Sequence, residues 1–267
     1  MNVEQDRVNR STWKLPSTVR VYQRLEGWTD PGERAAVEHV AAEAHGKPIL
    51  DIGVGAGRTI PLLRTISPDY VGIDYTPEMV AACRARHPDA RIEHMDARDL
   101  SRFEDDHFAL AVFSFNGIDA VHMDDRGRVL REVHRVLQHG GLFIVSAHNR
   151  NGPGHGERPR LRLDFTWNPL KLAWRTLRLA RSLPRSWLNS RRLRMLNETH
   201  DDWSIMNCGA HDFGIVVVYT TLAEQKRQLR AAGFGVEAVY DNVAGRLVAD
   251  DADTRAIWWL HYVARKA

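Results

Sequence analysis

The sequence has very little cysteine and no long apolar run. Its two cysteines, Cys83 and Cys208, lie far apart and form no Cys-x-x-Cys pair, so neither a zinc site nor a disulfide framework is predicted. The polar stretch Met1 to Arg10 has no hydrophobic signal-peptide region, and no run approaches the ~18 apolar residues of a membrane span. We therefore expect a cytoplasmic protein.

Acidic residues are scarce in one stretch only. The 267-residue chain has a formal net charge of +3, but between Arg158 and Arg194 eleven Lys and Arg residues stand against one acid, Asp164. That stretch carries +10, which leaves −7 for the remainder. Apolar content of 43% and charged content of 27% are ordinary for a globular protein, and the length suits one large domain. The basic character therefore belongs to a single insert.

A short apolar run from Ile49 to Ile52 contains one acid, Asp51, and leads into glycines at alternate positions, Gly53, Gly55 and Gly57. This pattern predicts the first strand of an open α/β sheet, turning sharply into a helix with its bare backbone against a ligand. Arg58 replaces the third glycine of a dinucleotide fingerprint, and a carboxylate would repel a pyrophosphate. Asp51 therefore favours a cationic ligand.

The glycine loop resembles motif I of the class I S-adenosylmethionine-dependent methyltransferases, whose cofactor carries an ammonium and a sulfonium. The resemblance runs from about Pro31 to Arg150 and resumes from about Tyr219 to the end. It implies a seven-stranded, mostly parallel Rossmann-like sheet with helices on both faces, whose last strand inserts between the fifth and sixth. It also implies that S-adenosylmethionine is the cofactor.

The predicted cofactor site continues beyond the glycine loop. Asp74 ends the second strand about twenty residues after the loop, where a carboxylate can accept both ribose hydroxyls; capping of the next helix is the alternative. The resemblance implies that Asp96 accepts the adenine amino group and that the backbone N–H of Ala97 meets the ring. A solvated loop acid is the other interpretation of Asp96. The full predicted set is Tyr22, Asp51, Gly53, Gly55, Gly57, Asp74, Tyr75, Asp96, Ala97 and Phe113.

Four segments organise the chain. They are an N-terminal lid over residues 1–30 without strong periodicity, a cofactor-binding core over 31–150, a basic helical lid insert over 151–214, and the C-terminal part of the core sheet over 215–267. Apolar periodicity and glycine breaks predict individual elements. The expected helices span 31–44, 59–64, 77–86, 124–137, 168–183 and 221–232, and the expected strands span 49–52, 70–73, 91–96, 108–113, 142–146, 236–240 and 257–264. Ile215 to Tyr219 fits either a short strand or part of the lid.

The basic insert admits three interpretations. On its predicted helix, Lys171, Arg175 and Arg178 fall on one face, and apolar residues such as Trp174 fall on another. The helix can cap the site and bind an acidic or phosphorylated substrate, or rest on an anionic membrane surface. It can also be a solvated face whose arginine stems cover apolar surface.

Methyl transfer from a sulfonium mainly requires positioning and exclusion of water, so no strong catalytic signature is expected. A hydroxyl or ammonium acceptor needs a base, for which histidine is suited at neutral pH. The candidates are His148 after the fifth strand and His211, next to Asp212, with Tyr219 as a substrate-orienting hydroxyl. Each histidine also fits a purely structural role. The acids and histidines show no metal-ligand spacing, so no metal site is predicted.

The leading hypothesis is a methyltransferase that acts on a nitrogen or oxygen of a small molecule. One alternative is a methyltransferase for a lipid or quinone at the membrane surface, and another is a non-catalytic S-adenosylmethionine-binding protein. The amino-methyltransferases of this fold that act on nucleic acids or glutamine carry an Asn/Asp-Pro-Pro-aromatic motif after the fourth strand. Ser114 to Gly117 lack it, and no RNA-binding module is recognisable, so a nucleic-acid acceptor is disfavoured.

Overall fold

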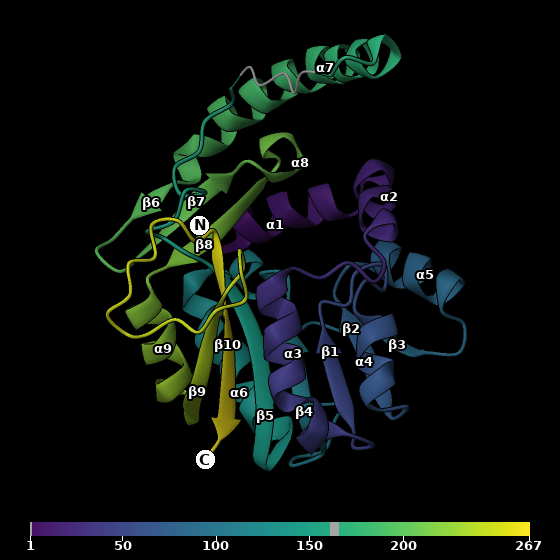
Figure 1. Cartoon of the computed structure of the whole chain (residues 1–267), viewed down its shortest axis with the longest axis vertical. Helices are drawn as coiled ribbons and strands as arrows, with labels where there is room; N and C mark the ends of the chain where they lie inside the picture. Colours follow the sequence, from purple (N-terminus) through teal and green to yellow (C-terminus); the bar gives the residue numbers. More distant parts are fainter. Residues whose placement is uncertain (1, 161–165) are drawn as a thin grey trace.

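The core is one twisted sheet (Figure 1). The computed structural model describes residues 2–160 and 166–267, so Asp164 of the basic insert lies outside the described part. Seven strands run in the order β3-β2-β1-β4-β5-β10-β9. They are β1 Ile49–Ile52, β2 Tyr70–Asp74, β3 Arg91–His94, β4 Phe108–Phe113, β5 Leu137–His148, β9 Phe234–Asp241 and β10 Trp259–Lys266.

The strand directions confirm the predicted fold class. Strands β1 to β5 pair in parallel, and β10 pairs antiparallel with both β5 and β9. The last strand therefore inserts between the fifth and sixth strands of the sheet, as the resemblance implied. Because the parallel strands share one direction, their carboxyl ends meet along a single edge, where open α/β sheets bind ligands.

Two apolar layers cover the sheet. The first is formed with α3 Pro31–Ala44, α4 Ile60–Ile66 and α5 Pro77–Arg86, and the second with α6 Met123–Val136 and α9 Leu222–Ala231. Strands β1, β2, β4, β5, β9 and β10 contribute residues to both layers, since successive strand side chains point to opposite faces. In β1, for example, Leu50 and Ile52 belong to one layer and Ile49 to the other.

A small antiparallel sheet lies above the core. It has the order β6-β7-β8, with β6 Glu198–Thr199, β7 Trp203–Cys208 and β8 Ile215–Thr220, so the 215–219 segment is a strand that pairs with the insert and not with the core. It is accompanied by α7 Pro169–Leu193, η2 Arg194–Leu196 and α8 Ala210–Phe213. Among the described residues, no helix combines the length and apolar character needed to cross a bilayer.

The N-terminal segment is helical although its sequence shows no strong periodicity. It forms α1 Asn2–Trp13 and α2 Pro16–Arg24, which lie across the top of the core beneath α8 (Figure 1). Asn9 fixes α1 to the small sheet, because its side-chain amide donates to the Val216 carbonyl and its side-chain oxygen accepts from the Val216 N–H, at 2.8 and 2.9 Å. The side chain thus pairs with β8 much as a further strand would.

Two predicted boundaries are wrong. Helix α6 ends at Val136, and β5 already runs through Gly140 and Gly141, which we expected to end the helix. A register shift between β4 and β5 accommodates these glycines within the strand. Helix α7 continues past Leu183 to Leu193 and contains Pro184. Pro184 and Ala180 are both exposed, so water can satisfy the carbonyl that the proline leaves without a donor.

We predict that Arg58→Met destabilises the fold by about 3–5 kcal/mol. Both guanidinium Nη atoms of Arg58 donate to the Glu33 carboxylate, at 2.6 and 2.7 Å, and the substitution leaves that buried charge without a partner. The control is Arg64→Met, which breaks the exposed pair with Asp89 and should cost at most about 1 kcal/mol. Urea unfolding measures both, and equal losses would contradict the argument.

Candidate active site

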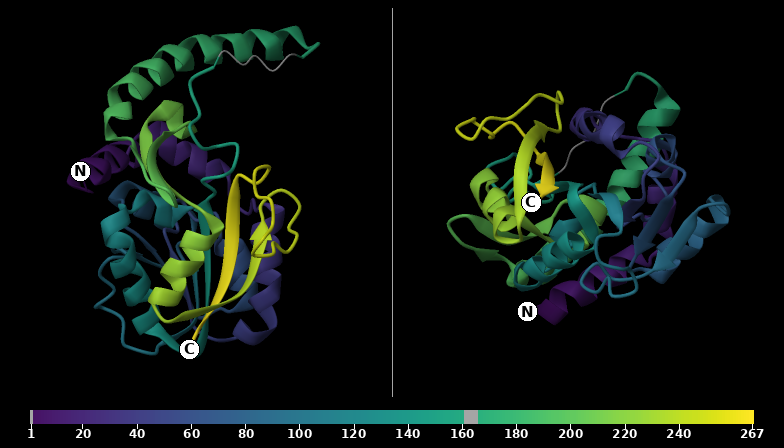
Figure 2. Two further views of the ribbon diagram at one scale, coloured as in Figure 1. Left: turned by 90° about the vertical axis from the view of Figure 1, so that its left-hand side faces the viewer. Right: turned by 90° about the horizontal axis from the view of Figure 1, so that it is seen from below.

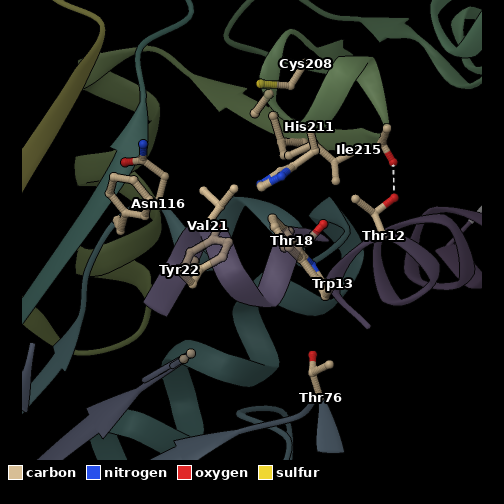
Figure 3. Close-up of a pocket in the computed structure, with 18 of the residues that line it drawn as sticks. Thr12, Trp13, Thr18, Val21, Tyr22, Thr76, Asn116, Cys208, His211 and Ile215 are labelled. Atoms are coloured by element: carbon tan, nitrogen blue, oxygen red, sulfur yellow. Dashed lines mark hydrogen bonds between the residues drawn. The ribbon is translucent and has the colours of Figure 1, made fainter. Parts of the chain in front are cut away.

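A cavity of about 1280 Å³ lies above the carboxyl ends of β1, β2, β4 and β5. Residues of α1, α2 and α8 form its roof, and one face of α7 lines its outer part. Figure 3 shows side chains from these separate segments converging on the space. The cavity therefore joins the core sheet, the N-terminal helices and the insert in a single site.

The glycine loop forms part of the cavity wall. Gly53 and Gly55 line it with φ values of +69° and +56°, which side chains rarely tolerate. A Cβ at Gly53 would lie 3.0 Å from the Phe113 ring, and one at Gly55 would lie 3.6 Å from the Tyr22 ring. Bare backbone at these two positions therefore keeps the space between Phe113 and Tyr22 open.

Asp74 connects the loop to the next helix. One carboxylate oxygen accepts from the Gly55 N–H at 3.0 Å and the other from the Thr76 N–H at 2.8 Å. Burial raises the pKa of this carboxyl above its ordinary value. The carboxylate also accepts a hydrogen bond from the Thr76 side chain, which leaves part of its acceptor capacity unused, and Asp74 and its neighbour Tyr75 both line the cavity. The carboxylate can thus still accept hydrogen bonds from a ligand.

Asp96 and Ala97 line the next part of the cavity. Asp96 Oδ2 accepts from Arg98 Nη2 at 2.7 Å and from Arg10 Nη2 at 3.0 Å. Burial raises the pKa of the Asp96 carboxyl, but the hydrogen bonds from Arg98 outweigh this effect and the pKa lies below its usual value. The guanidinium of Arg10 also lies over the Tyr75 ring, 4.2 Å from its centroid. Helix α1 is therefore tied to this wall of the cavity.

A histidine–carboxylate pair stands at the end of β5. His148 Nδ1 lies 2.8 Å from Asp119 Oδ2, which also accepts from the His148 backbone N–H at 2.6 Å. Because an ionised carboxylate only accepts, this contact assigns the proton to Nδ1 and leaves the lone pair on Nε2. His148 Nε2 is 3.4 Å from Asn116 Nδ2, and both residues line the cavity.

The other oxygen of Asp119 is held by Arg126. Arg126 Nη1 donates to Asp119 Oδ1 at 2.8 Å, and both side chains are at most 1% exposed. The remaining guanidinium nitrogens donate to Gln225 and Gln228 of α9. Sequence reasoning missed Asp119 and Arg126, and the only available signal was an acid shortly after β4, at the end of the sheet where His148 was expected.

The central part of the chain is similar to known proteins. Residues 49–141 match the family model for a methyltransferase domain. A probable S-adenosylmethionine-dependent methyltransferase of Mycolicibacterium smegmatis is 32% identical over 113 residues, which cover 42% of this chain and 42% of that protein. Over residues 49–141 the chain is therefore similar to S-adenosylmethionine-dependent methyltransferases.

The chain is also similar to a further curated protein and to a solved structure. The phosphatidylethanolamine N-methyltransferase of Cereibacter sphaeroides is 32% identical over 121 residues, which cover 43% of this chain and 56% of that protein. The 1,6-didemethyltoxoflavin-N1-methyltransferase of Burkholderia thailandensis, solved with 1,6-didemethyltoxoflavin and S-adenosylhomocysteine, has a TM-score of 0.61 at 16% identity, over 100% of this chain and 91% of that one. The chain thus spans about half the length of the curated relatives it matches, and the solved structure confirms the Rossmann-like fold.

Two residues of the predicted cofactor site lie outside the cavity. The Asp51 side chain points into the sheet layer beneath α4, where its Oδ2 accepts from Thr59 Oγ1 at 2.5 Å and from the Tyr70 hydroxyl at 2.7 Å. Direct contact with a cationic ligand is therefore not its role in this structure. At Gly57 φ is +96°, and a Cβ there would lie 2.6 Å from His87 Cδ2, so this glycine permits close packing of the loop against α5.

His211 meets the N-terminal helices inside the cavity. Its ring stacks on Tyr22, with centroids 5.8 Å apart and planes 20° apart, and Trp13 packs edge-on against both rings (Figure 3). Burial lowers the pKa of His211 to about 4, so the imidazole is neutral at pH 7. A nitrogen of such low basicity is a weak general base.

Tyr219 lies behind His148 and not in the cavity wall. The two rings are 5.0 Å apart, and the buried Tyr219 hydroxyl donates to the Gly154 carbonyl at 3.1 Å. Burial raises the pKa of this hydroxyl well above its ordinary value. Its geometry supports the histidine ring more directly than it reaches a substrate. Within residues 2–160 and 166–267 we find no cluster of metal-ligating side chains.

The Asp51 contacts predict a pH-dependent stability of the protein. Burial raises the pKa of Asp51 from its ordinary 3.8 to about 6, so the folded state favours the protonated carboxyl. The resulting stabilisation is present below about pH 4 and is lost as the pH rises through about 6, by up to about 3 kcal/mol. Asp51→Asn should remove this component. Urea unfolding between about pH 4 and pH 7 tests it, and parallel stability profiles for the two proteins would show that Asp51 is not the titrating group.

Proposed function

We propose that this protein binds S-adenosylmethionine in the cavity and transfers its methyl group to a nitrogen or oxygen of a small molecule. The observation that carries the proposal is the contact between His148 and the buried Asp119, because it directs a basic nitrogen into the same cavity as the glycine loop. The family match over residues 49–141 and the neighbour solved with S-adenosylhomocysteine support the choice of cofactor.

The cofactor is placed by the wall residues. The backbone of Gly53 and Gly55 faces its methionine part, Asp74 accepts from the ribose hydroxyls, and Asp96 with the Ala97 N–H meets the adenine. Tyr75 and Phe113 bound the nucleoside, and Tyr22 closes over it from the N-terminal lid. This placement is supported by the lining of the cavity and by the lone pairs that remain on Asp74.

The reaction is an in-line displacement at the methyl carbon. The acceptor lone pair forms the new bond to carbon, the carbon–sulfur bond breaks, and S-adenosylhomocysteine leaves with the bonding pair. His148 Nε2 takes the proton from the acceptor O–H or N–H, and Asp119 stabilises the imidazolium that results. The aromatic roof of Trp13, Tyr22 and His211 excludes water.

Nitrogen is the preferred acceptor atom. The Cereibacter relative and the Burkholderia neighbour are both named as N-methyltransferases. An ammonium acceptor must lose a proton before it can attack, as a hydroxyl must, and His148 can take the proton in either case.

Asp74→Asn should weaken S-adenosylmethionine binding by about 1–3 kcal/mol, because an amide offers the ribose hydroxyls one acceptor oxygen in place of two. Isothermal titration calorimetry with S-adenosylmethionine and S-adenosylhomocysteine measures the change. Asp253→Asn, in an exposed loop pair with Arg255, is the control and should bind as the wild type does. If neither compound binds to the folded wild-type protein, the cofactor assignment is wrong.

His148→Gln should slow methyl transfer by roughly 10²–10⁴-fold and leave cofactor affinity unchanged, since only the proton acceptor is removed. The rate is followed as S-adenosylhomocysteine formed with a small-molecule extract of the source cells, and mass spectrometry identifies the compound that gains a methyl group. The control, His139→Gln, changes an exposed histidine of the same strand, far from the cavity. Equal rates in the two variants would remove His148 as the base. Cofactor binding without turnover of any extract would instead favour a non-catalytic binding protein.

A further inference from the structure

The cavity extends well beyond the places assigned to the cofactor. Its outer part is bounded by α2 on one side and by α7 on the other, and its volume of about 1280 Å³ exceeds the roughly 300–1000 Å³ of ordinary small-molecule pockets. Helix α7 rests on α8 near its C-terminal end, where Asn189 Nδ2 donates to the Asp212 carbonyl at 3.0 Å. Its N-terminal half extends outward above α2 (Figures 1 and 2). A groove thus leads from the aromatic roof to the surface.

Large apolar side chains line both walls of this groove and are unusually exposed. Leu15 and Val21 lie at the α2 wall, and Trp174, Leu177 and Leu188 lie on the α7 wall; they are between 45% and 60% exposed. On α7 these three residues fall close together on a helical projection, so they form one stripe along the helix. Exposed apolar surface that lines a cavity and faces other apolar surface marks a binding groove.

Two arginines interrupt the apolar stripe. Arg181 and Arg185 lie four residues apart on the same face of α7, and both are exposed and line the cavity. Neither has a carboxylate partner among the residues that the structure describes. In contrast, the lining Arg98 is paired with Asp96 and with Asp125. Two adjacent guanidinium groups without partners offer several donors to an anion such as a phosphate or carboxylate.

We propose that the α2–α7 groove binds an amphiphile: its hydrocarbon chain lies along the Leu15, Val21, Trp174, Leu177 and Leu188 side chains, and its anionic group contacts Arg181 and Arg185. The methyl acceptor is accordingly a long-chain molecule that carries an acidic group. This inference rests on the proposed function for the identity of the reaction, but the binding of the amphiphile does not depend on it.

The geometry favours a single molecule over a flat or polymeric partner. The apolar residues come from two separate helices and line one cavity, so they suit one hydrocarbon chain held between two walls better than the plane of a bilayer. Nucleic acid would place its phosphates on the arginines but would leave the apolar walls without a counterpart. Charge and apolarity together therefore select an anionic amphiphile.

The test uses dodecyl phosphate below its aggregation concentration, titrated calorimetrically into the full chain with and without S-adenosylhomocysteine. We expect saturable binding, with inorganic phosphate and dodecanol each at least about tenfold weaker. The double variant Arg181→Gln/Arg185→Gln should lose about tenfold in affinity for dodecyl phosphate. Leu177→Asn should weaken the binding of dodecyl phosphate through its hydrocarbon chain and leave the affinity for inorganic phosphate unchanged. The control pair Arg191→Gln/Arg192→Gln, on the same helix but outside the cavity lining, should bind as the wild type does.

Three results would overturn the proposal. They are no binding of dodecyl phosphate, equal losses in the groove and control variants, and stronger binding of a short oligonucleotide that competes with the amphiphile. Flotation with vesicles of phosphatidylglycerol and phosphatidylcholine provides a further test. If the groove double variant and the control double variant reduce vesicle binding equally, and monomeric dodecyl phosphate does not bind, α7 belongs to a bilayer surface and the proposal is wrong. Failure of the proposed function would be seen separately, as absence of S-adenosylmethionine binding in a protein that still binds dodecyl phosphate.

Discussion

The carboxylate of Asp119 is the interaction on which the site depends. It lies in η1 Gly117–Ala120, and it joins Arg126 of α6 to both the backbone and the ring of His148 at the end of β5. A buried carboxylate is costly unless it is paired and fully hydrogen-bonded, and here Arg126 and His148 together satisfy both oxygens. The same contacts that make this charge tolerable in the interior also determine which imidazole nitrogen faces the cavity.

Backbone strain gathers around the same space. Among the described residues other than glycine, positive φ values occur at Phe115 and Asn116 after β4, at the turn from His211 to Phe213, and at Asp106; of these, Phe115, Asn116, His211 and Asp212 line the cavity. Such conformations cost of order 1–3 kcal/mol each and persist only where the surrounding contacts hold them. The first pair places Asn116 beside His148, and the turn places His211 against Tyr22. The strained positions therefore shape the two sides of the cavity.

Local sequence patterns were sufficient for the core but not for its lids. The glycine loop, the apolar runs and Asp74 are short-range signals that predicted the individual strands and the ligand-binding edge, and the family resemblance implied the seven-stranded sheet and the place of its last strand. Asp119 could not be assigned because its partner is His148, and only the paired strands bring the two together. We expected Asp51 to face the ligand, whereas its side chain accepts from Tyr70. Tyr70 lies on a neighbouring strand, and the sequence does not reveal the register of the two strands. Helix α1 lacks a clear amphipathic period because it packs against β8, α2 and η1 at once.

The most direct test of the account is a crystal structure of the protein with S-adenosylhomocysteine bound. The account predicts that the ribose contacts Asp74, that the adenine lies beside Asp96 and Ala97, and that the sulfur faces the part of the cavity where Asn116 and His148 Nε2 lie. The His148–Asp119 contact should be retained in the complex. A nucleoside bound elsewhere, or an imidazole that has turned away from Asp119 and is screened from the sulfur by other side chains, would contradict it.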